Sequence, residues 1–175
     1  MTQKLIFIAG SPSGTSRSTR LLRGVADRLE RAGIATQGYS FRDFNADKLL
    51  NADGNDVAIS RFVDDVKVSA GIVVSTPVYK ATYAGSLKVV LDVIPPDALV
   101  GKVALGIATA RIAEHLEGTG KALGAVFDFF RIGQQLKPRL LRDEIVFGDI
   151  NAQNLSAEAD SILDEAAREL AHALR

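Results

Sequence analysis

The densest group of hydroxyl and cationic side chains in the sequence lies at residues 11–18, Ser-Pro-Ser-Gly-Thr-Ser-Arg-Ser. This segment follows a short apolar run and precedes an amphipathic stretch, a pattern that predicts a buried strand, a loop and the first turn of a helix. The first N–H groups of a helix bind anions, serine hydroxyls add donors, and Arg17 adds a fork of N–H groups that suits phosphate. The segment therefore predicts a phosphate site. Its candidate ligands are Ser11, Ser13, Ser16, Arg17 and Ser18.

The kind of phosphate is narrowed by the motifs that the loop lacks. A nucleoside triphosphate loop requires Gly-Lys-Ser or Gly-Lys-Thr, and neither occurs in the sequence. A dinucleotide loop requires G-x-G-x-x-G, which Gly10 and Gly14 do not complete, and Pro12 lacks an N–H group. Hydroxyl groups in place of glycines favour a terminal monophosphate such as that of FMN. An ordinary connection whose serines cap the helix fits the same residues equally well.

The composition excludes several other kinds of chemistry and partner. The sequence of 175 residues has no cysteine, which rules out disulfides, thiolate nucleophiles and cysteine-bound zinc, and its two histidines, His115 and His172, are isolated. Lysine and arginine together number 21, as do aspartate and glutamate, so we expect no nucleic-acid partner. The sequence shows neither a long apolar run nor a signal-peptide pattern, so we expect a cytoplasmic protein without a membrane partner.

Strands and helices are expected to alternate within a single domain at residues 1–175. The expected strands lie at 5–8, 34–41, 71–75, 102–108 and within 136–147. The expected helices lie at 16–32, 57–69, 86–94, 114–131 and 156–174. Residues 42–55 are polar and predict a long loop with one turn at 47–50. This alternation predicts an α/β fold, a doubly wound five-stranded parallel sheet with helices on both faces.

Ligands of such sheets bind beyond the carboxyl ends of the strands, where the strand order reverses. Three of the predicted loops would meet at that edge: residues 11–18 after the first strand, 76–85 after the third, and 109–111 after the fourth. The first loop would hold the phosphate, and the other two would hold a flat ring system.

Two of these loops carry a pattern that resembles the NADPH-dependent FMN reductases. The pattern comprises Gly10-Ser11-Pro12 with Ser16-Arg17-Ser18, then Thr76-Pro77-Val78-Tyr79-Lys80-Ala81, Gly85, Leu87-Lys88 and Leu91-Asp92. The resemblance covers residues 4–130 and includes Gly101-Lys102-Val103, Ala108-Thr109 and His115-Leu116. Within the family the chain looks most like the sulfonate-type reductases, which supply reduced flavin to a partner monooxygenase.

The resemblance implies a flavodoxin-like fold, a homodimer or homotetramer, and FMN and NADPH as cofactors. It places the FMN phosphate in the first loop and the isoalloxazine ring along residues of the other two. These residues are Pro77, Val78, Tyr79, Lys80, Thr109, Ala110 and Arg111. Direct hydride transfer needs no acid or base from the protein, so no catalytic side chain is expected. His115 is expected at a helix N-terminus rather than in the role of a general acid.

Two departures from the family pattern stand out. Family members usually have Thr-Gly-Gly where this chain has Thr109-Ala110-Arg111, and glycine permits a close approach that alanine and arginine restrict. Arg111 could therefore reach the flavin or the 2′-phosphate of NADPH, or it could be a solvated loop residue. Lys121 replaces an aromatic residue that sulfonate-type reductases often carry, which weakens the assignment to that type.

Several alternatives fit parts of the sequence. A related enzyme could retain its FMN and reduce a quinone, an azo dye or a metal oxyanion. A flavodoxin-type electron carrier is usually acidic, and the zero net charge argues against it. A dinucleotide-binding module could place Arg42 on a 2′-phosphate, but the glycine fingerprint is missing.

The aromatic residues near position 130 predict a subunit interface as well as core packing. Leu123, Phe127 and Phe130 share a helical face. Phe129 lies outside that face, so the aromatic cluster is too broad for one buried stripe. We expect this face to contribute to a homo-oligomer interface.

Overall fold

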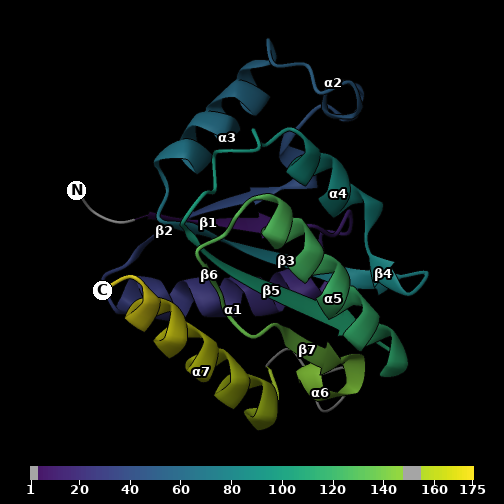
Figure 1. The fold of residues 1–175 in the computed structure, drawn as a ribbon. Coiled ribbons are helices and arrows are strands. Elements are labelled where there is room, and N and C mark those ends of the chain that lie inside the picture. Colours follow the sequence, from purple (N-terminus) through teal and green to yellow (C-terminus); the bar gives the residue numbers. More distant parts are fainter. Residues whose placement is uncertain (1–3, 148–154) are drawn as a thin grey trace.

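A computed structural model describes residues 4–147 and 155–175, and it contains a twisted parallel sheet between two layers of helices (Figure 1). The strands are β1 (Lys4–Ala9), β2 (Ala35–Ser40), β3 (Gly71–Tyr79), β4 (Thr82–Tyr83), β5 (Val103–Ala110), β6 (Gln134–Gln135) and β7 (Arg139–Arg142). Their order is β2-β1-β3-β5, and β6 and β7 both pair with the far side of β5, in parallel. This is the flavodoxin-like strand order, so the predicted fold class is confirmed.

The helices cover both faces of the sheet. They are α1 (Arg17–Arg31), α2 (Ala46–Leu50), α3 (Val57–Val68), α4 (Gly85–Asp92), α5 (Glu114–Phe129), α6 (Asp143–Phe147) and α7 (Ala157–Ala173), with a 3₁₀ turn at Phe41–Asp43. α1 and α7 pack against one face, and α3, α4 and α5 pack against the other. The turn expected at 47–50, within the 42–55 segment, corresponds to the short helix α2. The side chain of Asn45 caps this helix.

The central strands are buried on both faces. In β1, Leu5 and Phe7 face the layer of α1 and α7, whereas Ile6 and Ile8 face the other core. β3 repeats this arrangement, which explains why both strands appear in the sequence as unbroken apolar runs. The alternation fixes the strand register, and it thereby fixes where each following loop leaves the sheet.

β3 continues to Tyr79, beyond the expected end at residue 75. Its partner β1 ends opposite Ser75, so Pro77 pairs only with Thr109 of β5, and its missing N–H group disrupts no second ladder. The chain then turns back into β4 through Lys80 and Ala81, whose φ angles are 52° and 66°, as in a type I′ hairpin. The expectation that Pro77–Tyr79 belong to a loop is therefore wrong.

The fifth strand position is occupied by two short pieces. β6 and β7 are separated by residues 136–138, where Pro138 lacks the N–H group that a continuous ladder requires. The strand expected within 136–147 thus corresponds to β7, and residues 143–147 form α6. β5 also extends beyond its expected end, because Thr109 and Ala110 pair with β7.

The expected interface face of α5 lies in the core of the protein. Leu123, Phe127 and Phe130 are 1–3% exposed and pack against the sheet. The helix approaches β5 closely at Gly106, where an added Cβ would lie 3.0 Å from Leu123 Cδ1. The expectation that these three residues form a subunit interface is therefore wrong, because this single chain already buries them.

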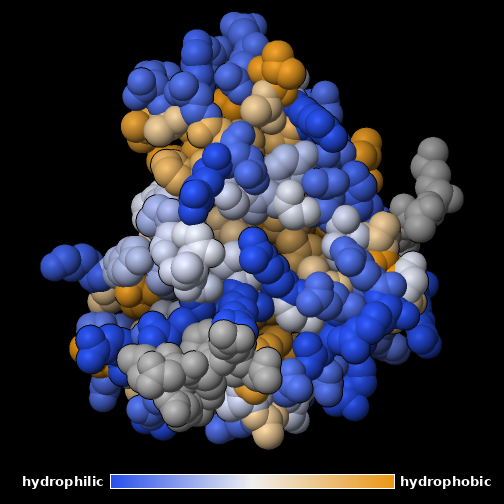
Figure 2. Space-filling model, turned by 180° about the vertical axis from the view of Figure 1, so that it is seen from behind, coloured by the Kyte–Doolittle hydropathy of each residue, from blue (hydrophilic) through white to orange (hydrophobic). Residues whose placement is uncertain are grey.

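Exposed apolar side chains occur elsewhere on the surface. In the rear view, hydrophobic groups gather mainly over the upper part of the molecule, where α2 and α3 lie (Figure 2). Leu50, Val57 and Val68 are 68%, 82% and 78% exposed on these helices. On α5, Phe129 is 65% exposed. These positions, unlike Phe127, are apolar groups accessible to another molecule.

The two phenylalanines of α5 give a stability test. We expect Phe127→Ala to lower the free energy of unfolding by about 3–5 kcal/mol, because it empties a fully packed core position. Phe129→Ala, on the same helix, should cost less than about 1 kcal/mol, because its ring is mostly in solvent. Urea denaturation followed by circular dichroism measures both. Similar losses for the two variants would contradict this assignment of core and surface.

Candidate functional site

The loops that follow β1, β3 and β5 enclose one pocket at the carboxyl edge of the sheet. Its volume is about 470 Å³, within the range of small-molecule sites. The lining residues are Ser11, Ser13, Thr15, Ser16, Arg17, Pro77, Val78, Tyr79, Thr109, Ala110, Arg111, Ile112, His115 and Asp143. The structure thus brings together ten of the twelve predicted site residues, and only Ser18 and Lys80 lie outside this lining.

The first loop is held in shape by its own hydroxyl groups. The Ser11 side chain is buried, and its Oγ accepts a hydrogen bond from the N–H of Ser13 at 3.2 Å. Ser16 is the N-cap of α1 and accepts from the N–H of Thr19, so the capping interpretation is also correct. Capping and anion binding are compatible here, because the N–H groups of the first helical turn have no partner inside the helix.

Ser18 supports the loop from inside the protein. It is fully buried, and its Oγ lies 2.9 Å from Ser16 Oγ. It therefore orients Ser16, and the expectation that its own side chain lines the site is not met. Next to this loop, Gly10 fits between β3 and α4, where an added Cβ would lie 2.5 Å from Leu87 Cβ and 2.7 Å from the Ser75 carbonyl oxygen.

Arg17 supplies the positive charge at this end of the pocket. Its Nη1 lies 3.5 Å from Oδ2 of Asp143, and 36% of its side chain is exposed. Its Nε is buried and has no hydrogen-bond acceptor among residues 4–147 and 155–175. A buried N–H without an acceptor is costly, so this atom is suited to an anion that enters the pocket. The hydroxyl groups and the free guanidinium edge fit a phosphate.

The opposite end of the pocket is less polar. Pro77 and Val78 are half-buried and Ala110 is buried, and together they offer apolar surface near the hydroxyl of the buried Thr109. Tyr79, the last residue of β3, is 52% exposed at the rim. Such walls fit a flat heterocycle, so the two ends of the pocket match the two ends of FMN.

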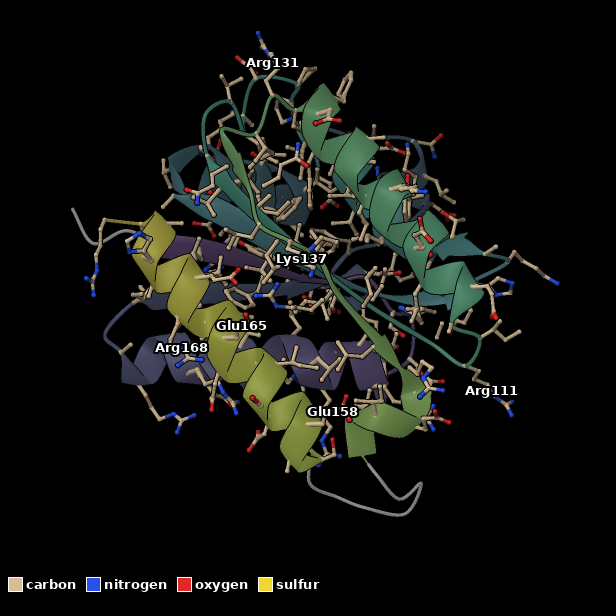
Figure 3. The ribbon with its side chains drawn as sticks, turned by 60° about the horizontal axis from the view of Figure 1, so that its bottom comes forward. Arg111, Arg131, Lys137, Glu158, Glu165 and Arg168 are labelled. Carbon is tan, nitrogen blue, oxygen red and sulfur yellow. The ribbon has the colours of Figure 1, made fainter. Side chains whose placement is uncertain are left out.

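The predicted cations have different positions. Arg111 directly follows β5, lines the pocket and is exposed, and its side chain extends away from the body of the protein (Figure 3). Lys80 occupies the tip of the β3–β4 hairpin and does not line the pocket. Lys121 is 76% exposed and pairs with Glu117 at 2.7 Å, so it does not contact the pocket either.

The pocket lining also includes four residues that were not among the predicted site residues: Thr15, Ile112, His115 and Asp143. Asp143 begins α6, in the region 136–147 within which a strand of unfixed bounds was expected. An aspartate followed by an apolar run signals a helix N-terminus, which could have located α6 but not its contact with Arg17.

A second hollow of about 630 Å³ lies on the other side of the first loop, between α1 and β2. Arg42 and Arg23 line it, and Arg42 lies against Gly14, where an added Cβ would come within 2.5 Å of Nη1. Asp27, Glu30 and Asp43 line the same hollow, so its charges are mixed. Arg42, which the dinucleotide alternative requires, thus does not line the pocket that holds Arg17.

Within residues 4–147 and 155–175, no group of three or more metal-ligating side chains could hold a metal ion. No helix in the same part of the chain is long and apolar enough to span a membrane.

Comparisons with known proteins identify the family of this chain. The family model for NADPH-dependent FMN reductase matches residues 3–136. An FMN reductase (NADPH) of Escherichia coli is 37% identical over 70% of this chain, and one of Pseudomonas putida is 36% identical over 76%. The aligned regions span 64% and 68% of those relatives' own lengths, about two thirds.

A solved structure extends the similarity to nearly the whole chain. The apo form of an NADH:FMN oxidoreductase superposes with a TM-score of 0.86 and 26% identity, covering 99% of this chain and 91% of that one. Together with the match over residues 3–136, these findings show that the chain belongs to the NADPH-dependent FMN reductase family.

Proposed function

We propose that this protein is an NADPH-dependent FMN reductase, which binds FMN in the pocket at the carboxyl edge and transfers a hydride to it from NADPH. The observation that carries the proposal is the pocket itself. It joins a hydroxyl-rich loop, with an Arg17 Nε that has no acceptor among the described residues, to apolar walls from β3 and β5. The names of the relatives support the same activity.

The protein's contribution is binding and orientation. FMN, when bound, supplies the hydride-accepting chemistry. In this proposal the loop at residues 11–18 holds the phosphate, and residues 77–79 and 109–111 border the ring. The exposed side chains of Tyr79 and Arg111 leave one side of the pocket open to NADPH. No side chain of the pocket needs to act as an acid or base.

The activity is tested by following NADPH oxidation with and without added FMN, on protein whose bound flavin has been quantified. We expect oxidation to depend on added FMN, because an enzyme that releases reduced flavin must rebind the oxidised form. Retained flavin together with turnover on a quinone would instead indicate the alternative of a flavin-retaining reductase. No NADPH oxidation with FMN would contradict the proposal.

The phosphate loop gives a separate binding test. Arg17→Ala should weaken FMN binding by about 1.5–3 kcal/mol, because it removes charge-assisted hydrogen bonds to the phosphate. Riboflavin has the same ring without the phosphate, so its affinity should change little. Flavin fluorescence titrations measure both dissociation constants. Equal losses for FMN and riboflavin would show that the loop is not a phosphate site.

A substitution of Arg111 distinguishes two roles for this residue, binding the 2′-phosphate of NADPH and stabilising the reduced flavin. Its exposed position favours the 2′-phosphate of NADPH. Arg111→Ala should then weaken NADPH binding by about 1.5–3 kcal/mol and leave NADH turnover nearly unchanged. Steady-state kinetics with both nucleotides measure this difference. If turnover falls equally with both and the FMN reduction potential falls, Arg111 stabilises the reduced flavin instead. No change in either quantity would exclude both roles.

We also propose that reduced FMN is passed to a partner monooxygenase, as in the sulfonate-type reductases, and that the protein works in the cytoplasm as a homodimer or homotetramer. The open pocket supports flavin exchange, since Tyr79 and Ile112 at its rim are 52% and 51% exposed. The exposed apolar groups on α2 and α3 support self-association. Lys121 counts against the sulfonate type, because reductases of that type often carry an aromatic residue where this chain has Lys121.

A further inference from the structure

The pocket contains a negative charge at the end where an anion is expected. Asp143 is the acidic residue among the described residues that line the pocket. Its Oδ2 lies 3.5 Å from Nη1 of Arg17, and its side chain is 21% exposed. It comes from α6, outside the region that the family model matches.

The Arg17–Asp143 contact is an ion pair without a close hydrogen bond. A separation of 3.5 Å is longer than the 2.7–2.9 Å typical of charge-assisted hydrogen bonds. The carboxylate therefore does little to fix the orientation of the guanidinium. Its main effects are electrostatic: it partly neutralises Arg17, and it repels other anions nearby.

A bound phosphate would compete with Asp143 for the same cation. The buried Nε of Arg17 has no acceptor among the described residues, whereas Nη1 already faces the carboxylate. A phosphate at this guanidinium would lie close to the carboxylate, and two anions that share one cation weaken each other's binding. Both competition and repulsion reduce FMN affinity, and riboflavin, which has no phosphate, experiences neither.

We propose that Asp143 sets the affinity of the pocket for phosphorylated flavin by opposing Arg17, and so promotes the release of FMN. The inference rests on the proposed function, because it takes the pocket to bind FMN by its phosphate. Asp143 is thus a specificity-determining residue that narrows the preference for FMN over riboflavin.

The test is the dissociation constant of Asp143→Asn for FMN and for riboflavin, measured by fluorescence titration. We expect FMN to bind about three- to tenfold more tightly than to the unaltered protein, with slower dissociation in stopped flow, and riboflavin to bind unchanged. The gain should shrink in 0.5 M salt, because screening weakens the repulsion. A structural defect in α6 would loosen FMN binding instead of tightening it.

Glu144→Gln is the matched control. Glu144 is the next residue of α6, pairs with Arg142 at 2.6 Å and does not line the pocket. The Glu144→Gln substitution removes the same charge as Asp143→Asn, but outside the pocket. Its effect on FMN affinity should therefore be less than twofold. A gain equal to that of Asp143→Asn would overturn the proposal, since a change in overall charge would then explain both.

Two further variants distinguish an error in the proposed phosphate site from an error in the role of Asp143. Asp143→Ser replaces the carboxylate with a neutral hydroxyl and should also tighten FMN binding, so the test does not depend on one substitution. If Arg17→Ala does not weaken FMN binding, the proposed phosphate site is wrong. If Arg17→Ala weakens it while both Asp143 variants leave it unchanged or weaker, the phosphate site stands and the role of Asp143 is wrong.

Discussion

The burial of β1 and β3 on both faces is the constraint on which the rest of the structure depends. Strands that helices cover on both faces are typical of a parallel sheet, and every parallel connection returns the chain to the same end of the sheet. The loops after β1, β3 and β5 therefore leave from one edge, although they are far apart in the sequence. The pocket follows from this topology, because β1 is the strand at which the order reverses.

The sequence predicted the parts of the fold that depend on local pattern. Apolar runs located β1, β3 and β5, and the helices expected at 16–32, 57–69 and 156–174 correspond to α1, α3 and α7, which Ser16, Asp56 and Ser156 cap. Features that depend on distant partners were not predictable in the same way. β3 extends past Pro77 because β1 has already ended, and the face of α5 with Phe127 is buried because β5 lies beneath it.

In the site, too, the features that depend on local sequence could be predicted, and those that depend on distant contacts could not. Its first loop lies in one short segment, so hydroxyl groups, Arg17 and a helix start could be recognised together. Asp143 could not be recognised, because its meaning comes from α6 and α1 meeting in space, and no motif joins residue 143 to residue 17. Ser18 could be predicted only in part. The motif includes it, but the sequence does not show that its side chain is buried against Ser16 Oγ.

The two ends of the pocket differ in charge: one end has an ion pair, and the rim has a single cation. At the phosphate end, Arg17 faces Asp143 and the pair is nearly neutral. At the rim, Arg111 has no acidic neighbour among the described residues that line the pocket apart from Asp143, which faces Arg17. In the proposed function, Arg111 thus places a positive charge where a nicotinamide nucleotide would enter. A cation at the entrance would attract an anionic nucleotide, and the Arg17–Asp143 pair beneath it would limit how firmly flavin is held. This arrangement suits an enzyme for which both molecules are substrates that must leave.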